Sequence, residues 1–232
     1  MKIKIFEDRF SQSKTDGFTF EPHSPFALIR KSLEFGGINQ HTNNAIARIN
    51  IRKCRNIEIL VEFKMINDNN NSDNWFGIKL RSTSPLLTDG YLIYIRSNGN
   101  VAVYTAGSDL PQAQFKSTGM VLGKKIIFRV RLVGSEFTIS VDGNTVTYND
   151  SNNRLLRDGD VYLYSNYTKN IIYDIRVWKI INLSNILKSK TFLSFALLVL
   201  LALLIIGLNH YYPQIVNSVV NSPSFRLWSG IK

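Results

Sequence analysis

Apolar and polar side chains alternate in short runs along residues 1–182, and Gly, Asn, Asp and Ser separate these runs. Neighbouring side chains on a β-strand point to opposite sides of a sheet, so a period of two predicts strands with one apolar face. The pattern therefore predicts an all-β domain, with no helix before residue 191. The clearest predicted strands cover residues 57–66, 75–81, 91–96, 101–105, 125–133, 136–141, 145–148, 161–164 and 171–181.

Two short segments between these strands predict β-hairpins. Residues 97–100 read Ser-Asn-Gly-Asn, and residues 142–144 read Asp-Gly-Asn. Such residues tolerate the positive φ angles of tight hairpin turns. We therefore expect each segment to join the strand before it to the strand after it.

The alternation also predicts which side chains form the core. On residues 171–178 it places Asp174, Arg176 and Trp178 on the opposite, solvent-facing side. About half of the strand residues would then fill the space between two sheets. The predicted core positions are Ile57, Ile59, Val61, Phe63, Met65, Phe76, Ile78, Leu80, Ile126, Phe128, Val130, Leu132, Ile171, Tyr173, Ile175 and Val177.

A different pattern occupies residues 192–208, where seventeen consecutive positions carry no charge. As a helix this stretch is about 26 Å long, which is the low end of what crosses the hydrocarbon core of a bilayer. Lys188 and Lys190 precede it, and Tyr211 and Tyr212 follow it, as at the two borders of a membrane. We predict a transmembrane helix, because a buried helix that is apolar on every side would need a larger protein around it.

The apolar segment divides the chain into four predicted parts. Basic residues gather before the helix, and none follows it until Arg226. By the positive-inside rule, the amino-terminal domain is expected on the cytoplasmic (or stromal or matrix) side of a single-pass protein. The first ten residues contain no signal peptide, so we expect insertion from the carboxyl end, as in tail-anchored proteins. The parts are a β-sandwich (1–182), a basic juxtamembrane linker (183–190), the transmembrane helix (191–209) and a short tail (210–232).

The charge of the chain is +11, and most of it belongs to the β domain. Without Arg226 and Lys232, 26 basic residues face 17 acidic ones. Such an excess favours anionic partners such as lipid headgroups or acidic glycans. Nucleic acid is not expected, because the basic residues are scattered and no RNA-recognition or zinc-finger pattern occurs. Cys54 is the single cysteine, which excludes an intrachain disulfide.

Five segments of the domain together resemble a known superfamily: IFEDRF, FGIKLRS, GYLIYIRSNGNVAVYTAG, KIIFRVRLVGSEFTISVDGNTV and DGDVYLYSNYTKNIIYDIRVWKI. They are similar to concanavalin A-like lectin and glucanase domains, and within these to laminin-G-like domains. The resemblance covers about residues 3–181. It implies a two-sheet antiparallel jelly-roll sandwich whose concave face or rim loops bind glycans or proteins.

The sequence gives little support for a catalytic site. Glycosidases need two carboxyl groups about 5–9.5 Å apart, whereas Glu58 and Glu62 share a strand face at a spacing of roughly 13 Å. The three histidines form neither a metal cluster nor a catalytic relay. We therefore expect a protein without catalytic activity. The alternative is an enzyme that acts on glycosides.

The Asn-rich segment 67–74 is a candidate for calcium, because it is dense in oxygen ligands and laminin-G-like domains often bind this ion. An EF-hand loop that began at Asp68 would need Gly at position 73 and Glu at position 79, where this chain has Asp73 and Lys79. A polar connection is therefore favoured. We expect no cofactor, with calcium as a minor alternative.

The remaining candidate site is an aromatic and basic sheet face. Trp and Tyr can stack on sugar rings, and Arg can pair with carboxylate, sulfate or phosphate groups. The alternative is that these residues cover an exposed sheet and pair with Glu62 and Asp174 on neighbouring strands. The candidate residues are Trp75, Lys79, Arg81, Tyr94, Arg96, Arg129, Arg131 and Arg176, on the assumption that their strands share a sheet.

The sequence thus predicts a membrane-anchored, non-catalytic binding or scaffolding module that recognises a glycan or a protein partner. One alternative is an accessory subunit of a larger membrane complex, in which the helix and the tail pack on other subunits. The other alternative is the glycoside-acting enzyme.

Overall fold

The computed structural model of the chain describes residues 1–10, 14–29, 31–37, 44–66, 74–105, 111–117, 119–150, 155, 157–181 and 190–211. By its internal contacts the chain divides into two compact units. The first unit, Met1–Ile181, is built of β-strands, and the second, Asn182–Lys232, contains a single described helix.

One layer of the first unit is sheet A, which has eight strands within the described residues. Seven of them follow one another across the sheet, and β1 (Lys2–Asp8) pairs with β15 beside them. The seven are, in spatial order, β13 (Asn144–Asn149), β12 (Glu136–Val141), β11 (Lys125–Val133), β6 (Ile57–Ile66), β15 (Lys169–Ile180), β4 (Ser32–Gly36) and β3 (Phe26–Ile29).

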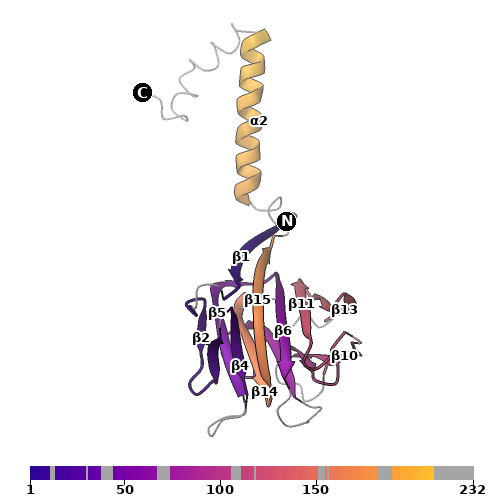
Figure 1. Cartoon of the computed structure of the whole chain (residues 1–232). Helices are drawn as coiled ribbons and strands as arrows, with labels where there is room; N and C mark the ends of the chain where they lie inside the picture. The colour runs from indigo at the N-terminus through magenta and orange to yellow at the C-terminus, as the bar shows by residue number, and fades with distance from the viewer. Residues whose placement is uncertain are drawn as a thin grey trace. The chain divides into compact units, whose positions relative to one another are not determined.

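The other layer is sheet B, with seven strands among the described residues. In spatial order they are β10 (Ala113–Lys116), β9 (Asn100–Thr105), β8 (Tyr91–Arg96), β7 (Trp75–Ser82), β14 (Gly159–Asn166), β5 (Asn44–Cys54) and β2 (Phe18–Phe20). The strand pairs of both sheets are antiparallel. In Figure 1, β4, β15 and β6 of sheet A lie side by side in front of β14 of sheet B.

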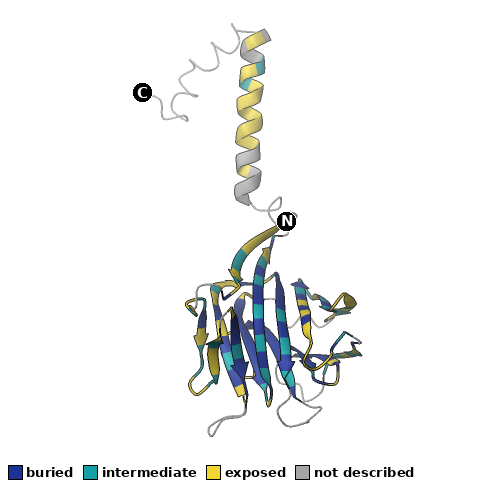
Figure 2. Cartoon of the chain, viewed as in Figure 1, coloured by how far each residue is buried: buried dark blue, intermediate teal, exposed yellow. Residues whose placement is uncertain are grey.

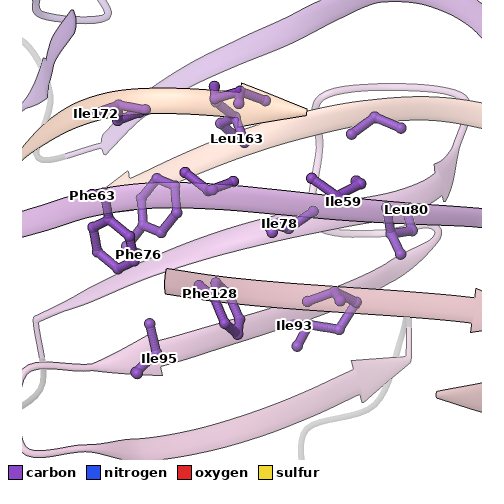
Figure 3. Close-up of a cluster of buried hydrophobic side chains, with 14 of the residues drawn as sticks. Ile59, Phe63, Phe76, Ile78, Leu80, Ile93, Ile95, Phe128, Leu163 and Ile172 are labelled. Atoms are coloured by element: carbon purple, nitrogen blue, oxygen red, sulfur yellow. The ribbon is translucent and has the colours of Figure 1, made fainter. Parts of the chain in front are cut away.

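The core lies between the two sheets. Phe63 on β6 and Phe76 on β7 come from opposite sheets, and their ring centroids are 4.5 Å apart. Figure 3 shows side chains of β6, β11 and β15 pointing toward side chains of β7, β8 and β14. The buried stretches of the central strands are dark blue in Figure 2. The period-two pattern therefore folds as predicted, with apolar faces of two antiparallel sheets packed against each other.

Most predicted strands and both predicted hairpins are confirmed. The turn at Gly99 joins β8 to β9, and the turn at Asp142 and Gly143 joins β12 to β13. All three residues have positive φ angles of 86°, 45° and 88°, which is the geometry that favours Gly and Asp in tight turns. The strands β1 to β5 and β10 have weaker patterns, and the alternation did not delimit them.

Two of the four residues of β15 that were predicted to lie in the core do not lie there. The pairing of β15 with β6 shifts register between Ile172 and Asp174, so a β-bulge inserts one extra residue. Because of this bulge, Ile172 is fully buried, whereas Ile171 and Tyr173 are only half-buried. Ile175 and Val177, which follow the bulge, are in the core as predicted.

The second unit contains the helix α2 (Lys190–Tyr211). Its side chains are described at residues 194, 197–207 and 210. Lys188 and Tyr212, which flank the helix, lie outside the described residues. Within the described part of the chain, no helical stretch is both long enough and apolar enough to cross a membrane. The transmembrane helix and its border residues Lys188, Lys190, Tyr211 and Tyr212 stay predictions from the sequence.

Candidate functional site

The outer face of sheet B, which points away from sheet A, brings several of the predicted site residues together. Strand register places its outward side chains in rows across β5, β14, β7, β8 and β9. One row contains Ile46, Tyr164, Gly77, Tyr94 and Ala102, and the next contains Arg48, Tyr162, Lys79, Leu92 and Tyr104. Trp75 and Arg96 are paired in a third row. Trp75, Lys79, Tyr94 and Arg96 therefore share one face.

Four rings on this face form an aromatic row, Tyr164, Trp75, Tyr94 and Tyr104. The ring centroids of successive members are 6.3, 5.1 and 5.6 Å apart. These separations fall within the roughly 4.5–7 Å of contacting aromatic pairs. Burial, together with a hydrogen bond to Tyr104, raises the pKa of Tyr94 to about 12. Its phenol is therefore neutral at physiological pH.

Gly77 makes room for this row. A Cβ atom at this position would lie 3.1 Å from Leu92 Cδ1, from Cζ3 of the Trp75 indole and from Tyr94 Cβ. Three neighbours at this distance would each have to move. The missing side chain thus lets the indole of Trp75 lie close to the strand between Tyr164 and Tyr94.

A pocket of about 200 Å³ opens beside the aromatic row. It is smaller than the ~300–1,000 Å³ of sites for drug-sized ligands, so it suits one small group, such as a single ring. Aromatic side chains line it from β7, β8 and β9, and the segment between β7 and β8 closes one side. The lining residues are Trp75, Lys79, Leu87, Asp89, Gly90, Leu92, Tyr94, Tyr104 and Thr105.

Lys79 lines the pocket, and its ammonium group is fully engaged in hydrogen bonds. The side chain is 1% exposed. Its Nζ donates to the carbonyl oxygens of Ser84 and Leu86, and to Asp89 Oδ1 at 3.0 Å. An ammonium group has three protons, and all three are used here. Burial lowers the pKa of Lys79, although the contact with Asp89 opposes this shift.

Asp89 is the centre of the segment that joins β7 to β8. Its Oδ2 accepts hydrogen bonds from Thr83 N at 2.7 Å and Thr83 Oγ1 at 2.6 Å, and Ser82 Oγ donates to its Oδ1. Arg157 Nη2 lies 3.0 Å from the same Oδ2. Burial would raise the pKa of this carboxyl, but the hydrogen bonds from Ser82, Thr83 and Lys79 outweigh it and hold the pKa well below 3.8.

Arg81 is not on the outer face, in contrast to the prediction. Its φ is +54°, and the pairing of β7 with β14 shifts register nearby, so its side chain turns into the protein. The guanidinium donates to three carbonyl oxygens, those of Arg55 at 2.8 Å, Leu155 at 3.0 Å and Gly134 at 2.6 Å. Burial lowers the pKa of Arg81 to about 10. Its role is to tie three chain segments together.

Arg129, Arg131 and Arg176 lie on the other sheet. The first two are on β11 and the third is on β15, so they belong to the outer face of sheet A. Arg176 Nη2 is 2.5 Å from Asp174 Oδ2, and both β11 arginines lie 3.9 Å from the carboxylate of Glu58. The assumption that all eight candidates share a sheet is therefore wrong, because the sandwich core separates these three from the pocket.

Arg96 remains as a cation on the face that carries the pocket. Its guanidinium carbon lies 5.6 Å from the centroid of the Tyr94 ring, and its Nη2 donates to Tyr94 Oη at 3.3 Å. The structure thus brings together Trp75, Lys79, Tyr94 and Arg96 from the predicted set.

Sequence reasoning missed Tyr104 and the segment 82–90. The hairpin around Gly99 could have revealed Tyr104, because its register puts Tyr104 opposite Leu92 and on the face of Tyr94. No comparable signal marks Asp89 or Leu87. Asp89 reaches the pocket through its side-chain contact to Lys79, and Leu87 lines the pocket from the same segment. Period-two patterning reports neither.

No metal centre is found within the described chain, where no three His, Cys, Asp or Glu side chains are grouped to hold an ion. The segment considered for calcium, 67–74, lies outside the described residues except for Asn74.

No family model matches the chain, and no curated protein matches it in sequence. Solved structures match it in fold. The carbohydrate-binding module CBM66 from Bacillus subtilis aligns with 67% of this chain and 91% of its own, with a TM-score of 0.54 at 14% identity. The exoplasmic/lumenal domain of VIP36, in its Ca²⁺/Man3GlcNAc-bound form, aligns with 76% of this chain and 89% of its own, with a TM-score of 0.58 at 11% identity.

A third structure, a Bacillus subtilis protein of unknown function with a galectin-like fold, aligns with 75% of this chain and 94% of its own. Its TM-score is 0.61 at 8% identity. Together these likenesses show that the first unit has a lectin-like jelly-roll β-sandwich fold, as predicted. The narrower resemblance to laminin-G-like domains stays a prediction.

Proposed function

We propose that the β-sandwich is a non-catalytic glycan-binding module and that the pocket beside the aromatic row holds a sugar ring. The observation that carries this proposal is the pocket itself, lined by Trp75, Tyr94 and Tyr104. Aromatic faces stack well on the C–H faces of sugars, and the pocket has room for one such unit.

The fold supports the same proposal. CBM66 is a carbohydrate-binding module, and the VIP36 domain was solved with Man3GlcNAc. Both share the two-sheet fold of this chain. In this chain, the aromatic row lies on the outer face of one of the two sheets. Fold alone does not define function, so the glycan-binding role depends on the pocket residues.

The state of the charged groups favours an uncharged sugar. Lys79 has no proton left for a ligand, and the carboxylate of Asp89 is neutralised by Lys79 and Arg157. Arg81 is committed to backbone carbonyls. The acidic glycan expected from the sequence would depend on Arg96 alone among the four predicted residues that share this face.

A binding role without catalysis fits the same chemistry. Hydrolysis of a glycosidic bond needs two carboxyl groups on either side of the bond, one of them protonated. Among the described residues that line the pocket, Asp89 is the one with a carboxyl group, and its low pKa makes it a poor proton donor. The enzyme alternative is therefore less well supported than the binding role.

A glycan array tests the proposal with the full chain in a detergent that contains no sugar, because glucoside or maltoside detergents would compete. We expect binding to neutral glycans, and a loss of at least about tenfold in affinity on Trp75→Ala, since an aromatic platform contributes ~1–3 kcal/mol. Trp178→Ala on sheet A is the matched control and should bind normally. Equal affinity of the two variants, or no binding by the folded protein, contradicts the proposal.

We also propose that residues 191–209 anchor the module in a membrane, with the β domain on the cytoplasmic (or stromal or matrix) side. The uncharged sequence 192–208 and the exposed leucines of α2, such as Leu197, Leu198 and Leu200, support this. Protease protection in sealed membranes tests both points. Full digestion of the β domain from the cytoplasmic side is expected, and protection would place the domain on the other side.

The accessory-subunit alternative makes a separate demand. It requires a stable complex with other proteins after extraction in mild detergent. A monodisperse monomer would exclude it and would leave the glycan-binding proposal intact.

A further inference from the structure

Two leucines project from the segment between β7 and β8 at the edge of the pocket. Leu86 is 64% exposed and Leu87 is 51% exposed, and Leu87 also lines the pocket. Single exposed leucines are common on proteins and need no explanation. This pair differs from others because it adjoins the aromatic pocket. We call Leu86 and Leu87 the leucine rim.

The leucine rim is held in place by buried polar contacts rather than by packing of the leucines. The carbonyl oxygen of Leu86 accepts a hydrogen bond from Lys79 Nζ, whose side chain is almost fully buried. Asp89, on the other side of the two leucines, is fixed by Ser82, Thr83 and Lys79. The chain therefore buries an ammonium group, which is costly, to hold a segment whose apolar side chains face solvent.

The chemistry of this edge does not suit a free sugar. Leucine side chains offer no hydrogen bonds, so a sugar hydroxyl placed against them would lose its contact with water without compensation. An apolar substituent on the sugar would instead cover the leucines and leave water itself. The aromatic row and the leucine rim together present a surface for a ring and for an adjoining aliphatic chain.

We propose that the pocket recognises a sugar that carries an apolar substituent, with the ring beside Trp75 and the aliphatic part against Leu86 and Leu87. This inference rests on the proposed glycan-binding function and defines its ligand class as alkyl or acyl glycosides. Such chemistry occurs in soluble glycosides and in glycolipids.

Paired methyl and butyl glycosides of glucose, galactose, mannose and N-acetylglucosamine test the inference by calorimetry on the full chain. A fully buried CH2 group raises affinity about fourfold. With the three additional CH2 groups about half covered, we expect butyl glycosides to bind about tenfold more tightly than methyl glycosides. The double variant Leu86→Ser/Leu87→Ser should lose this difference and keep the affinity for the methyl glycoside.

Val121→Ser/Leu122→Ser is the matched control, because these residues are 48% and 43% exposed and do not line the pocket. This variant should keep the tenfold difference. Detergent micelles take up butyl glycosides equally in every sample, so the comparison between variants is unaffected. A glycolipid of the same sugar in those micelles forms a second arm. Tighter binding than the butyl glycoside, lost in the rim variant, assigns a lipid, whereas weaker binding assigns a soluble glycoside.

The two proposals fail in different ways. If no methyl or butyl glycoside binds, the glycan-binding function itself is contradicted. If both bind equally, or if the rim variant keeps the difference, the glycan-binding function stands and the leucine rim has no part in recognition.

Discussion

The two outer faces of the sandwich differ in the chemistry of their outward side chains. On sheet A the outward side chains form ion pairs between strands, such as Lys2 with Glu58 at 2.6 Å and Lys169 with Glu34 at 2.7 Å. On sheet B the outward side chains of the central strands include a row of aromatic rings, and Lys79 beside that row is buried, whereas Arg96 is only partly buried. Arg129 is 50% exposed, whereas Lys79 is 1% exposed.

This difference shows that the alternation of a strand does not tell whether an outward cation is exposed to water or buried. On sheet A the cations remain in contact with water, where ion pairs contribute little to the stability of the fold and are easily screened by salt. On sheet B a buried cation must find every hydrogen-bond partner inside the protein, and it then organises the surrounding segments. The comparison predicts large effects for the buried charges near sheet B and small effects for the water-exposed ion pairs on sheet A.

The largest effect is expected for Arg81→Met. The substitution keeps the aliphatic stem but leaves the carbonyl oxygens of Arg55, Leu155 and Gly134 without their donor. Unsatisfied buried groups cost ~1–3 kcal/mol each, so we expect a loss of about 4 kcal/mol in the free energy of unfolding. Urea unfolding followed by tryptophan fluorescence measures it. Arg96→Met, on the same sheet but partly exposed, should change stability by less than about 0.5 kcal/mol.

A smaller and pH-dependent effect is expected for Asp89→Asn. The folded pKa of Asp89 lies below 3.8, so its carboxylate stabilises the fold above that pH, and this stabilisation is lost as the pH falls through the folded pKa. We expect a loss of about 2 kcal/mol at pH 7. The gap from the parent protein should close toward pH 2 in urea unfolding. A gap that stays constant with pH would contradict the assigned role of the charge.

The smallest loss among the three ion-pair and buried-charge substitutions is expected for Glu58→Gln on sheet A. Glu58 is itself buried, but its partners Lys2, Arg129 and Arg131 are 51%, 50% and 40% exposed and can return to water. We expect a loss of about 1 kcal/mol, which salt should reduce further. The measurement is urea unfolding at low and high ionic strength. A loss as large as that of Arg81→Met would remove the distinction between the two faces.

Much of the fold could be predicted from the sequence, because the central strands follow simple alternation. Phe63, Phe76 and Phe128 are in the core as predicted. The pattern failed where the backbone departs from regular pairing. The bulge after Ile172 reverses the facing of side chains in β15, and alternation carries no mark of the extra residue.

The candidate site was less predictable, because its members depend on sheet membership and on local backbone geometry. Trp75, Tyr94 and Arg96 were placed correctly on one face, since β7 and β8 are joined directly. Arg131 has the same alternation as these residues but belongs to the other sheet. Arg81 continues the alternation of β7, yet its positive φ turns it inward. A strand pattern reports which side chains share a face of one strand, but not which strands share a sheet.

The absent side chain at Gly77 has a consequence for the indole of Trp75. Since a methyl group there would press on Trp75, Leu92 and Tyr94, the close approach of the indole to the strand depends on glycine. A tryptophan followed two positions later by glycine on a strand thus leaves room for an indole to lie over the glycine, as Trp75 does in this chain.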